Sequence, residues 1–364
     1  MATKVLVVDD TIFYRKTLKD ILASIPDVEV VGTANNGKVA LSRIKALKPD
    51  LLTLDVEMPE MNGLEVLKEI QKQGYDVECL MVSSLTQKGG EMTVQALSLG
   101  ALDFISKPDA ATAEQNTALL KKAIEPKLRA FHRRRELKNL LKGRPGPAKP
   151  TVSKQEVTDL DAVIAKSKAG TSRTEKSKAI ALGVSTGGPN ALNKVIPKLQ
   201  PTLNVPVFVV QHMPKTFTAS LAQVLNKNSP LEVKEAQNGE VVLPNVVYIA
   251  PGGRQMKVAS AAQGQLIIRV TDDPPENNCK PSVDYLFRSV AREYGSKATA
   301  VILTGMGSDG KLGVKVMKSA GAVSIAQNAA TCVVYGMPKA VVDAGLADIV
   351  APIDAISNEI HKTV

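Results

Sequence analysis

The chain has no tryptophan and few other aromatic residues. Phe, Trp and Tyr together make up 3% of its 364 residues. Proteins that bind single-stranded nucleic acid stack the bases on aromatic side chains, so this composition argues against that class. Long apolar runs are also missing, because no stretch reaches the roughly 18 consecutive apolar residues that indicate a membrane-spanning helix. We therefore expect a protein that is not embedded in a membrane.

Cysteine is scarce as well. The three cysteines, Cys79, Cys279 and Cys332, lie far apart in the sequence, and this spacing indicates neither a disulfide framework nor a zinc site. The first residues, MATKVLVVDD, enter a strand-like pattern directly and lack the apolar region and cleavage site of a signal peptide. We expect a cytoplasmic protein.

The basic excess of the chain is confined to one segment. The formal net charge is +10, from 46 Lys and Arg against 36 Asp and Glu. Residues 121–154 hold 12 of the basic and two of the acidic residues, so the rest of the chain is balanced. A basic domain face that would bind nucleic acid is therefore not indicated. The segment is interpreted as a solvated linker helix, with docking on an acidic partner as the alternative.

Alternating strand-like and helix-like patterns predict two α/β domains. In the first 120 residues, apolar runs alternate with amphipathic stretches of helical spacing, which favours a doubly wound parallel sheet. A basic helical pattern and a segment rich in Pro, Gly, Ser and Lys follow. A second alternating series begins at Ala179 and predicts a Rossmann-like, mostly parallel sheet. The predicted divisions are a first domain at 1–122, a basic helical and partly disordered linker at 123–177, and a second domain at 178–364.

Charged side chains follow successive predicted strands of the first domain. In a doubly wound sheet, functional groups gather at the carboxyl ends of the strands. These ends carry three carboxylates, two hydroxyls and a lysine, namely Asp9, Asp10, Asp55, Ser83, Ser84 and Lys107. A cation such as Mg²⁺ would relieve the repulsion among the carboxylates. Helix capping explains one of these acids but not the whole set, so the pattern predicts an aspartate that accepts a phosphoryl group.

The motifs VVDD (7–10), LTLDVEMPEMNG (52–63), MVSS (81–84) and FISKP (104–108) resemble the receiver domain of response regulators. The resemblance covers the whole first domain and implies that Asp55 is phosphorylated by a histidine kinase. The other roles that it implies are Mg²⁺ binding by Asp10, Asp55 and the carbonyl of Glu57 with Asp9 in support, phosphoryl contacts from Ser83 and Lys107, and an aromatic switch at Phe104.

Two glycine-rich loops of the second domain compete for a phosphate-binding role. GVSTGGP (183–189) lies between a predicted strand and helix, and TGMGSDG (304–310) contains a G-x-G-x-x-G pattern. A dinucleotide site also needs an acidic residue at the end of the next strand, about 20 residues on. That predicted strand ends at Gln327 and Asn328. Nucleotide binding is therefore disfavoured and is kept only as an alternative.

Acyl transfer explains the same loops better. It needs a nucleophile, a base, an orienting acid and donors for an oxyanion. Ser185 and His212 follow two consecutive predicted strands, which tend to be spatial neighbours, and Asp309 follows a third. A hydrogen-bonded structural role is the alternative for His212, and the spacing alone leaves it open. Cys279 is not expected to act as a nucleophile, because no second histidine accompanies it.

Six motifs from Ala179 onward look like the chemotaxis protein-glutamate methylesterases, the CheB family. They are ALGVSTGGPNAL, VVQHMPKTFTASLAQVLN, VYIAPGGRQM, KPSVDYLFRSVA, VILTGMGSDGKLGV and AQNAATCVVYGMPKAV. The resemblance implies a phosphorylation-activated serine esterase that hydrolyses glutamate methyl esters, and deamidates glutamines, on methyl-accepting chemotaxis receptors. The roles it implies are Ser185 as nucleophile, His212 as general base and acid, Asp309 as the group orienting His212, and Thr186 and Met306 at the oxyanion site.

The resemblance further implies a chemotaxis-type histidine kinase as phosphodonor, Mg²⁺ in the receiver, no cofactor for the esterase, and a monomer. Asn278 and Cys279 stand where Arg-His is expected in this family, which leaves the choice of receptor open. The rival hypothesis is a non-catalytic regulator, a receiver joined to a degenerate α/β binding module. The intact set of Ser185, His212 and Asp309 argues against it.

Overall fold

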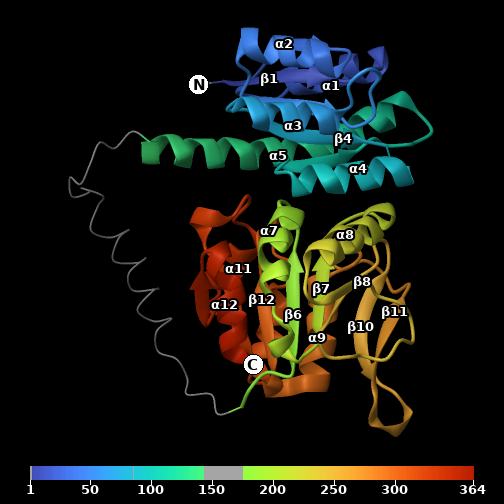
Figure 1. Ribbon diagram of the computed structural model, residues 1–364, viewed down its shortest axis with the longest axis vertical. Helices are drawn as coiled ribbons and strands as arrows, with labels where there is room; N and C mark the ends of the chain where they lie inside the picture. Colours follow the sequence, from blue (N-terminus) through green and yellow to red (C-terminus); the bar gives the residue numbers. More distant parts are fainter. Residues whose placement is uncertain (1, 85, 143–174) are drawn as a thin grey trace, which may run out of the picture. The chain divides into compact units, whose positions relative to one another are not determined.

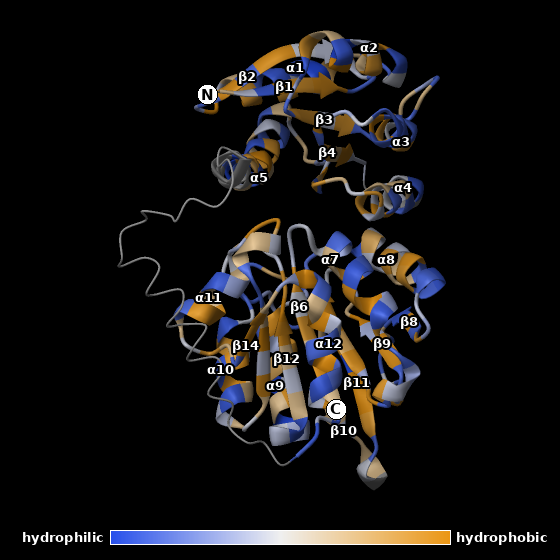
Figure 2. Cartoon of the chain, turned by 60° about the vertical axis from the view of Figure 1, so that its left-hand side comes forward, coloured by the Kyte–Doolittle hydropathy of each residue, from blue (hydrophilic) through white to orange (hydrophobic). Residues whose placement is uncertain are grey.

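The computed structural model describes residues 2–84, 86–142 and 175–364. The chain forms two compact units, Met1–Asn139 and Leu140–Val364, and in each of them helices flank a sheet (Figure 1). This confirms the predicted α/β class. The strands of both units are mostly hydrophobic, whereas hydrophilic segments lie on the outer sides of the helices (Figure 2). Residues 143–174, which belong to the predicted linker, lie outside the described residues.

The first unit is built on a five-stranded parallel sheet in the order β2-β1-β3-β4-β5. Its strands are β1 (Thr3–Val8), β2 (Val28–Ala34), β3 (Leu51–Asp55), β4 (Glu78–Ser83) and β5 (Asp103–Ser106). Its helices are α1 (Ile12–Ala23), α2 (Gly37–Leu47), α3 (Gly63–Gln73), α4 (Gln87–Ser98) and α5 (Ala113–Lys142). Every residue of β3 is buried, as expected for a parallel strand that is covered on both faces. At the start of α3, Asn62 and Glu65 form a reciprocal capping box.

Helix α5 crosses the predicted boundary of the first domain. The boundary predicted at residue 122 falls inside it, and the basic helical pattern is its continuation. Leu120, Ile124, Leu128 and Phe131 recur at helical spacing and are buried. Further along, Arg135 forms an ion pair with Asp50 of the same unit, with 2.6 Å between Nη1 and Oδ2. These contacts explain why the first compact unit extends to Asn139.

The second unit contains a seven-stranded sheet in the order β14-β13-β12-β6-β7-β9-β8, with parallel pairing between neighbours. Its strands are β6 (Ala179–Val184), β7 (Val207–Gln211), β8 (Glu232–Glu235), β9 (Val246–Ile249), β12 (Ala298–Ile302), β13 (Val323–Gln327) and β14 (Ile349–Ala351). Its α-helices are α7 (Gly188–Val195), α8 (Lys215–Asn228), α9 (Val283–Tyr294), α10 (Lys311–Ser319), α11 (Met337–Asp343) and α12 (Ile353–Thr363). Short 3₁₀ turns are η1 (Ile196–Lys198), η2 (Pro201–Leu203), η3 (Ala262–Gly264), η4 (Gly295–Lys297) and η5 (Ala329–Thr331).

One predicted strand of the second domain lies outside this sheet. Strand β11 (Leu266–Thr271) pairs antiparallel with β10 (Gln255–Ser260) in a separate two-stranded sheet. Met256, Val258 and Ile268 of this hairpin are buried in the same hydrophobic cluster as Phe287 of α9. The apolar pattern of a short strand does not distinguish a parallel sheet from a hairpin, and here packing on α9 decides between them.

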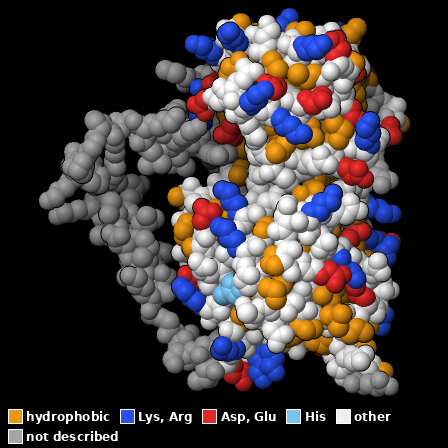
Figure 3. All heavy atoms as spheres, in the orientation of Figure 1, with side chains coloured by type: hydrophobic (Ala, Val, Ile, Leu, Met, Phe, Trp, Pro, Cys, Tyr) orange, Lys and Arg blue, Asp and Glu red, His pale blue; other side chains and the backbone are white. Residues whose placement is uncertain are grey.

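Two surface properties bear on the predicted function classes. None of the described helices has the length and apolarity needed to cross a membrane. On the face drawn in Figure 3, basic and acidic side chains are interspersed over both units. Among the described side chains of that face, no basic stripe of a single sign is visible (Figure 3).

Candidate functional site

The ends of three adjacent strands bring the predicted catalytic loops of the second unit together. Strand β6 lies between β12 and β7, so the residues that follow these strands meet at one edge of the sheet. The N–H of His212 donates to the carbonyl of Val184 (3.2 Å), and the N–H of Ser185 donates to the carbonyl of Thr304 (3.0 Å). The expectation that the strands before Ser185 and His212 are neighbours is confirmed.

Glycines allow these loops to approach one another closely. A Cβ on Gly305 would lie 2.8 Å from the Cβ of Ser185 and 2.4 Å from the Sδ of Met337. A side chain at this position would therefore push the 304–310 loop away from Ser185. Gly187 caps α7 in the left-handed region with φ 74°, which only glycine adopts without strain.

The glycine loop 304–310 supports Asp309 rather than a nucleotide. The position at which a dinucleotide site needs an acid is occupied by Gln327, which is buried. Its Oε1 accepts from the N–H of Thr304 (2.8 Å) and its Nε2 donates to the carbonyl of Thr331 (2.8 Å). Both ends of this amide are used inside the protein, so the residue is structural.

His212 and Asp309 form a direct pair. Nε2 of His212 lies 2.8 Å from Oδ2 of Asp309, and the aspartate is 3% exposed. Burial by itself would raise the pKa of Asp309, but the hydrogen bond and charge of His212, together with backbone N–H groups, lower it to about 2. Asp309 is therefore ionised at neutral pH, and His212 donates from Nε2.

Backbone and side-chain donors hold the carboxylate of Asp309 in place. Its Oδ2 accepts from the N–H of Val283 (2.7 Å). Its Oδ1 accepts from the hydroxyl of Ser282 (2.9 Å) and the amide of Asn277 (3.1 Å). Asn277 also donates to the buried Asp284 (2.9 Å). Neither Ser282 nor Asn277 was singled out in the sequence, because only their proximity to Asp309 in space reveals their role.

The other ring nitrogen of His212 faces a thiol. Sγ of Cys279 lies 3.7 Å from Nδ1 of His212, a contact that the sequence did not indicate, and it involves the same histidine that was predicted as the base for Ser185. Cys279 and His212 are 67 positions apart in the sequence. They meet because Cys279 lies in the loop between the β10–β11 hairpin and α9. Burial by itself would lower the pKa of His212, but hydrogen bonds with Asp309 and Cys279 and the charges of both raise it to about 9.

Ser185 and the predicted oxyanion donors lie beside this pair. Ser185 is half-buried and Thr186 is buried, and the carbonyl of Thr186 accepts from the hydroxyl of Thr304 (3.0 Å). Among the described residues, we find no hydrogen bond from the N–H of Thr186 or Met306, nor one between the hydroxyl of Ser185 and His212. Hydrogen bonds of catalytic groups are often long in substrate-free structures.

Gln211 connects the two catalytic loops and was also missed in the sequence. Its side chain is 2% exposed, and Nε2 donates to the carbonyls of both Ser185 (3.0 Å) and His212 (3.2 Å). A Cβ on Gly188 would lie 1.8 Å from its Oε1, so the glycine makes room for this amide. In the sequence, the only indication of this role was that Gln211 directly precedes His212.

The predicted acidic cluster of the first unit is assembled as expected. Oxygens of Asp9, Asp10 and Asp55 all lie within 4.8 Å of one another. Nζ of Lys107 lies 2.7 Å from Oδ2 of Asp55 and 2.8 Å from Oδ2 of Asp9. Burial, followed by the charge of Asp9, raises the pKa of Asp55 to about 7, although Lys107 opposes the shift.

These acids fit a hard divalent cation. The Oδ2 atom of Asp9 is buried and has no well-directed hydrogen bond within the described part of the chain, despite its ion pair with Lys107. Carboxylate oxygens are the ligands that Mg²⁺ prefers, and its charge would offset the repulsion that raises the pKa of Asp55. Glu57, whose carbonyl was predicted as a ligand, uses its side chain to accept from Ser84 (2.9 Å).

The remaining predicted residues of this site lie at the ends of β4 and β5. The hydroxyl of Ser83 donates to the carbonyls of Ser84 (3.1 Å) and Gly89 (3.2 Å) and not to Asp55. Its own carbonyl accepts from the N–H of Lys107 (2.7 Å), which keeps the two strand ends together. Phe104 is half-buried on β5.

Two residues that follow the acidic pair also support this site. Nη1 of Arg15 donates to the carbonyls of Asp9 (2.8 Å) and Asp10 (2.7 Å). Nζ of Lys107 lies 4.6 Å from the ring centroid of Tyr14, within cation–π range. The sequence identified the acids and the lysine, but not these neighbours.

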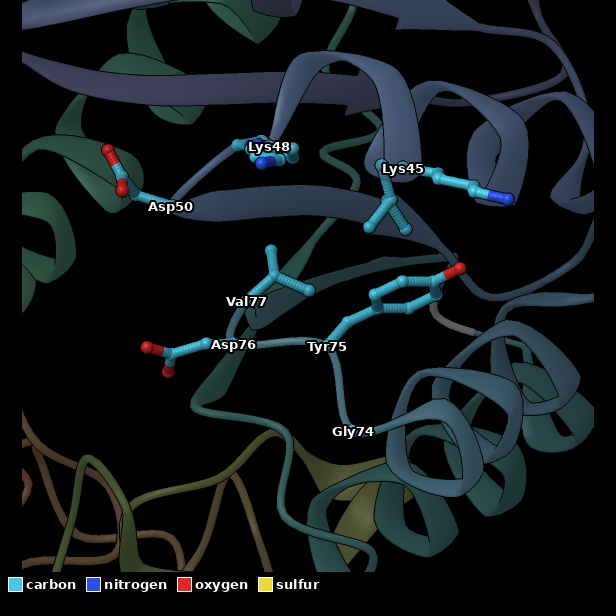
Figure 4. Close-up of a pocket in the computed structure, with 9 residues that line it drawn as sticks. Lys45, Lys48, Asp50, Gly74, Tyr75, Asp76 and Val77 are labelled. Carbon is cyan, nitrogen blue, oxygen red and sulfur yellow. The ribbon is translucent and has the colours of Figure 1, made fainter.

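A cavity of about 340 Å³ lies at the opposite, amino end of the same sheet. Its lining includes Lys45, Lys48, Asp50 and Tyr75 (Figure 4), and none of the predicted site residues belongs to it. Asp50 already accepts from the N–H of Lys4 and from Arg135. The predicted phosphorylation site therefore lies at the other end of the sheet from this cavity.

Comparisons with known proteins cover both units. Residues 180–360 match the family model described as CheB methylesterase, and residues 5–118 match the response regulator receiver domain. A curated relative from Desulfotalea psychrophila, named protein-glutamate methylesterase/protein-glutamine glutaminase, is 47% identical over 99% of this chain and 98% of its own. A relative of the same name from Bacillus subtilis is 45% identical, with the same coverage.

A solved structure matches the second unit. The crystal structure of the CheB methylesterase catalytic domain from Thermotoga maritima covers 52% of this chain and 100% of its own, with 43% identity and a TM-score of 0.51.

Proposed function

The chain belongs to the CheB family of protein-glutamate methylesterases/protein-glutamine glutaminases, and from this premise we propose that Ser185, His212 and Asp309 are its catalytic triad. The predicted enzyme class, a receiver-linked esterase, is confirmed, and the non-catalytic alternative finds no support. The observation that carries the triad is the 2.8 Å pair of His212 and Asp309 next to the loop of Ser185.

In the proposed reaction, the hydroxyl of Ser185 attacks the ester carbonyl of a glutamate methyl ester on a chemotaxis receptor. Nδ1 of His212 takes the hydroxyl proton, because Nε2 is held by Asp309. The same proton then goes to the leaving methoxide, so that methanol departs and a glutamyl-serine ester remains. Water, deprotonated by His212, hydrolyses this ester. A glutamine side chain would release ammonia by the same steps.

Two features of the site lower the barrier to this reaction. Asp309 stays ionised and stabilises the imidazolium that forms when His212 accepts the proton. The N–H groups of Thr186 and Met306, which have no internal acceptor in the described part of the chain, are the proposed donors to the oxyanion. Removing one such donor typically costs on the order of 10²–10³ in kcat.

We further propose that Asp55 accepts a phosphoryl group from a chemotaxis-type histidine kinase. Asp10, Asp55 and the carbonyl of Glu57 would hold Mg²⁺, with Asp9 in support, and the bound ion would neutralise charge on the phosphoryl group. Lys107 already contacts Asp55 and would hold a phosphoryl oxygen. Ser83 would have to leave its acceptor on α4 to do the same. Phe104 is the proposed aromatic switch.

The nucleophile is tested by Ser185→Ala in the full chain, with methanol release from methylated receptor membranes as the measurement. Release should fall by at least about 10³-fold. Ser319→Ala is the matched control, because Ser319 is exposed and its hydroxyl donates to the carbonyl of Lys315 on its own helix. Release that persists in Ser185→Ala would exclude Ser185 as the nucleophile.

A further inference from the structure

Cys279 and His212 present a sulfur and a nitrogen to the same point in space. Sγ and Nδ1 are 3.7 Å apart. Two ligands of one tetrahedral Zn²⁺, with bonds of about 2.3 Å to sulfur and about 2.05 Å to nitrogen, lie about 3.6 Å apart. The observed separation therefore matches that of two ligands sharing one zinc ion.

The surroundings of His212 are those of a metal-binding histidine. A histidine that ligates zinc through one nitrogen almost always donates from the other to a carboxylate or carbonyl. Here Nε2 donates to Asp309 (2.8 Å), which leaves the lone pair of Nδ1 directed away from the carboxylate. The ligand-type atoms of His212, Cys279 and Asp309 lie within 4.8 Å of one another.

Asp309 would orient His212 through its hydrogen bond with Nε2 and would not itself coordinate the zinc ion. Its two oxygens accept from the side chains of His212, Ser282 and Asn277. They also accept from the backbone N–H groups of Val283, Asp284 and Gly310. Its oxygens are thus occupied. The side chains of His212 and Cys279 are partly exposed, so water can supply the remaining ligands of the tetrahedron.

We propose that Cys279 and His212 bind Zn²⁺ and that the bound zinc inhibits the esterase. The inhibition rests on the proposed function, because zinc on Nδ1 occupies the nitrogen that accepts the proton of Ser185. On binding, the protons held by Sγ and by Nδ1 are released to solvent, and the thiolate and the neutral imidazole become ligands. Thiolate with imidazole selects Zn²⁺, whereas the all-oxygen cluster of the first unit suits Mg²⁺.

The other two cysteines do not offer such a site. Cys79 and Cys332 are buried, and burial raises the pKa of each thiol to about 12. Cys332→Ser is therefore a matched control for Cys279→Ser. Both substitutions replace a thiol by a hydroxyl, but only Cys279→Ser removes a proposed zinc ligand.

The test measures zinc binding directly, by competition with a chromophoric chelator on the full chain in excess Mg²⁺. We expect one zinc per chain in the wild type and in Cys332→Ser, and affinity at least about tenfold weaker in Cys279→Ser, equivalent to about 1.4 kcal/mol. Co²⁺, which takes the same ligands, should give a thiolate-to-metal absorption band that is absent in Cys279→Ser.

Methanol release is then titrated with Zn²⁺, each variant being compared with its own zinc-free rate. The zinc concentration for half inhibition should match the binding midpoint and rise at least about tenfold in Cys279→Ser. Zinc affinity that is the same in Cys279→Ser and the wild type would overturn the site. Zinc bound through Cys279 without loss of methanol release would overturn the inhibition and count against His212 as the base.

Discussion

The two neighbours of His212 favour its protonated form. Burial acts against this, but the contacts with Asp309 and Cys279 bring the pKa of His212 to about 9. A general base must be neutral, so kcat/KM of the free enzyme should rise with pH and level off only above about pH 9. The measurement is a pH profile of kcat/KM for methanol release in metal-free buffer.

The Cys279→Ala variant tests how much Cys279, as distinct from Asp309, raises the pKa of His212. It removes the contact of Cys279 with Nδ1 that helps to raise the pKa of His212, so the midpoint of the pH profile should shift downward and activity near pH 7 should increase. Cys332→Ser should leave the midpoint in place, because Cys332 makes no contact with His212 among the described residues. A Cys279→Ala profile that coincides with the wild type would contradict this account of the pKa.

Gln211 is a positioning residue for the same reaction. Gln211→Leu leaves the carbonyls of Ser185 and His212 without their shared donor, which should cost about 1–3 kcal/mol of stability. Because misplaced catalytic groups lower the rate of the chemical step, we expect kcat to fall on the order of 10–100-fold, with little change in KM and in the pH midpoint.

The control for Gln211 is Gln327→Leu, which removes a second buried glutamine that bridges two backbone groups. Its loss of stability should be comparable and its loss of kcat smaller, because Gln327 does not contact Ser185 or His212 in the described structure. Equal losses of kcat in the two variants would reduce Gln211 to a purely structural role.

At the scale of an element, α5 determines where the first unit ends. Phe131 is 4% exposed, whereas Leu119 on the same helix is 49% exposed. Phe131→Ala should destabilise the first unit by about 3–5 kcal/mol, while Leu119→Ala should cost less than about 0.5 kcal/mol. Urea unfolding of the full chain measures both, and equal effects would show that the helix does not pack beyond residue 122.

Elements were predictable where local periodicity carries the information. The runs that become β1, β3, β6 and β7 are short and mostly apolar, and nearly all of their residues are buried as parallel strands. The extension of the first unit along α5 and the separation of the β10–β11 hairpin from the main sheet were not predictable in this way. The first depends on contacts between segments distant in sequence, such as Arg135 with Asp50. The second depends on the packing of a local hairpin against α9, because strand periodicity does not identify the sheet that a strand joins.

At the scale of the whole molecule, phosphorylation of Asp55 is the proposed input to the esterase. It adds about −1.5 to −2 charges, and a bias of about 1.4 kcal/mol between inactive and active states changes their ratio tenfold. Asp55→Asn should keep basal methanol release but lose its stimulation by a small-molecule phosphodonor with Mg²⁺. The control is Asp109→Asn, which changes an exposed acid two residues after Lys107. It should keep both the basal release and its stimulation by the phosphodonor.

Removing residues 1–174 tests the direction of this coupling. Basal methanol release should rise if the receiver restricts access of the receptor to Ser185. A fall in basal release would mean that the receiver is needed for activity. In the Asp55→Asn experiment, stimulation by the phosphodonor would show that a residue other than Asp55 is phosphorylated.

The sequence by itself determined the residues that carry the proposed chemistry and the sheet edges on which they lie. Asp55, Ser185, His212 and Asp309 all follow apolar strand patterns, and parallel sheets collect such residues at one edge. Tertiary structure alone decided which groups touch. The contact of Cys279 with His212 and the bridge from Gln211 arise because chain packing joins side chains whose spacing has no local periodicity.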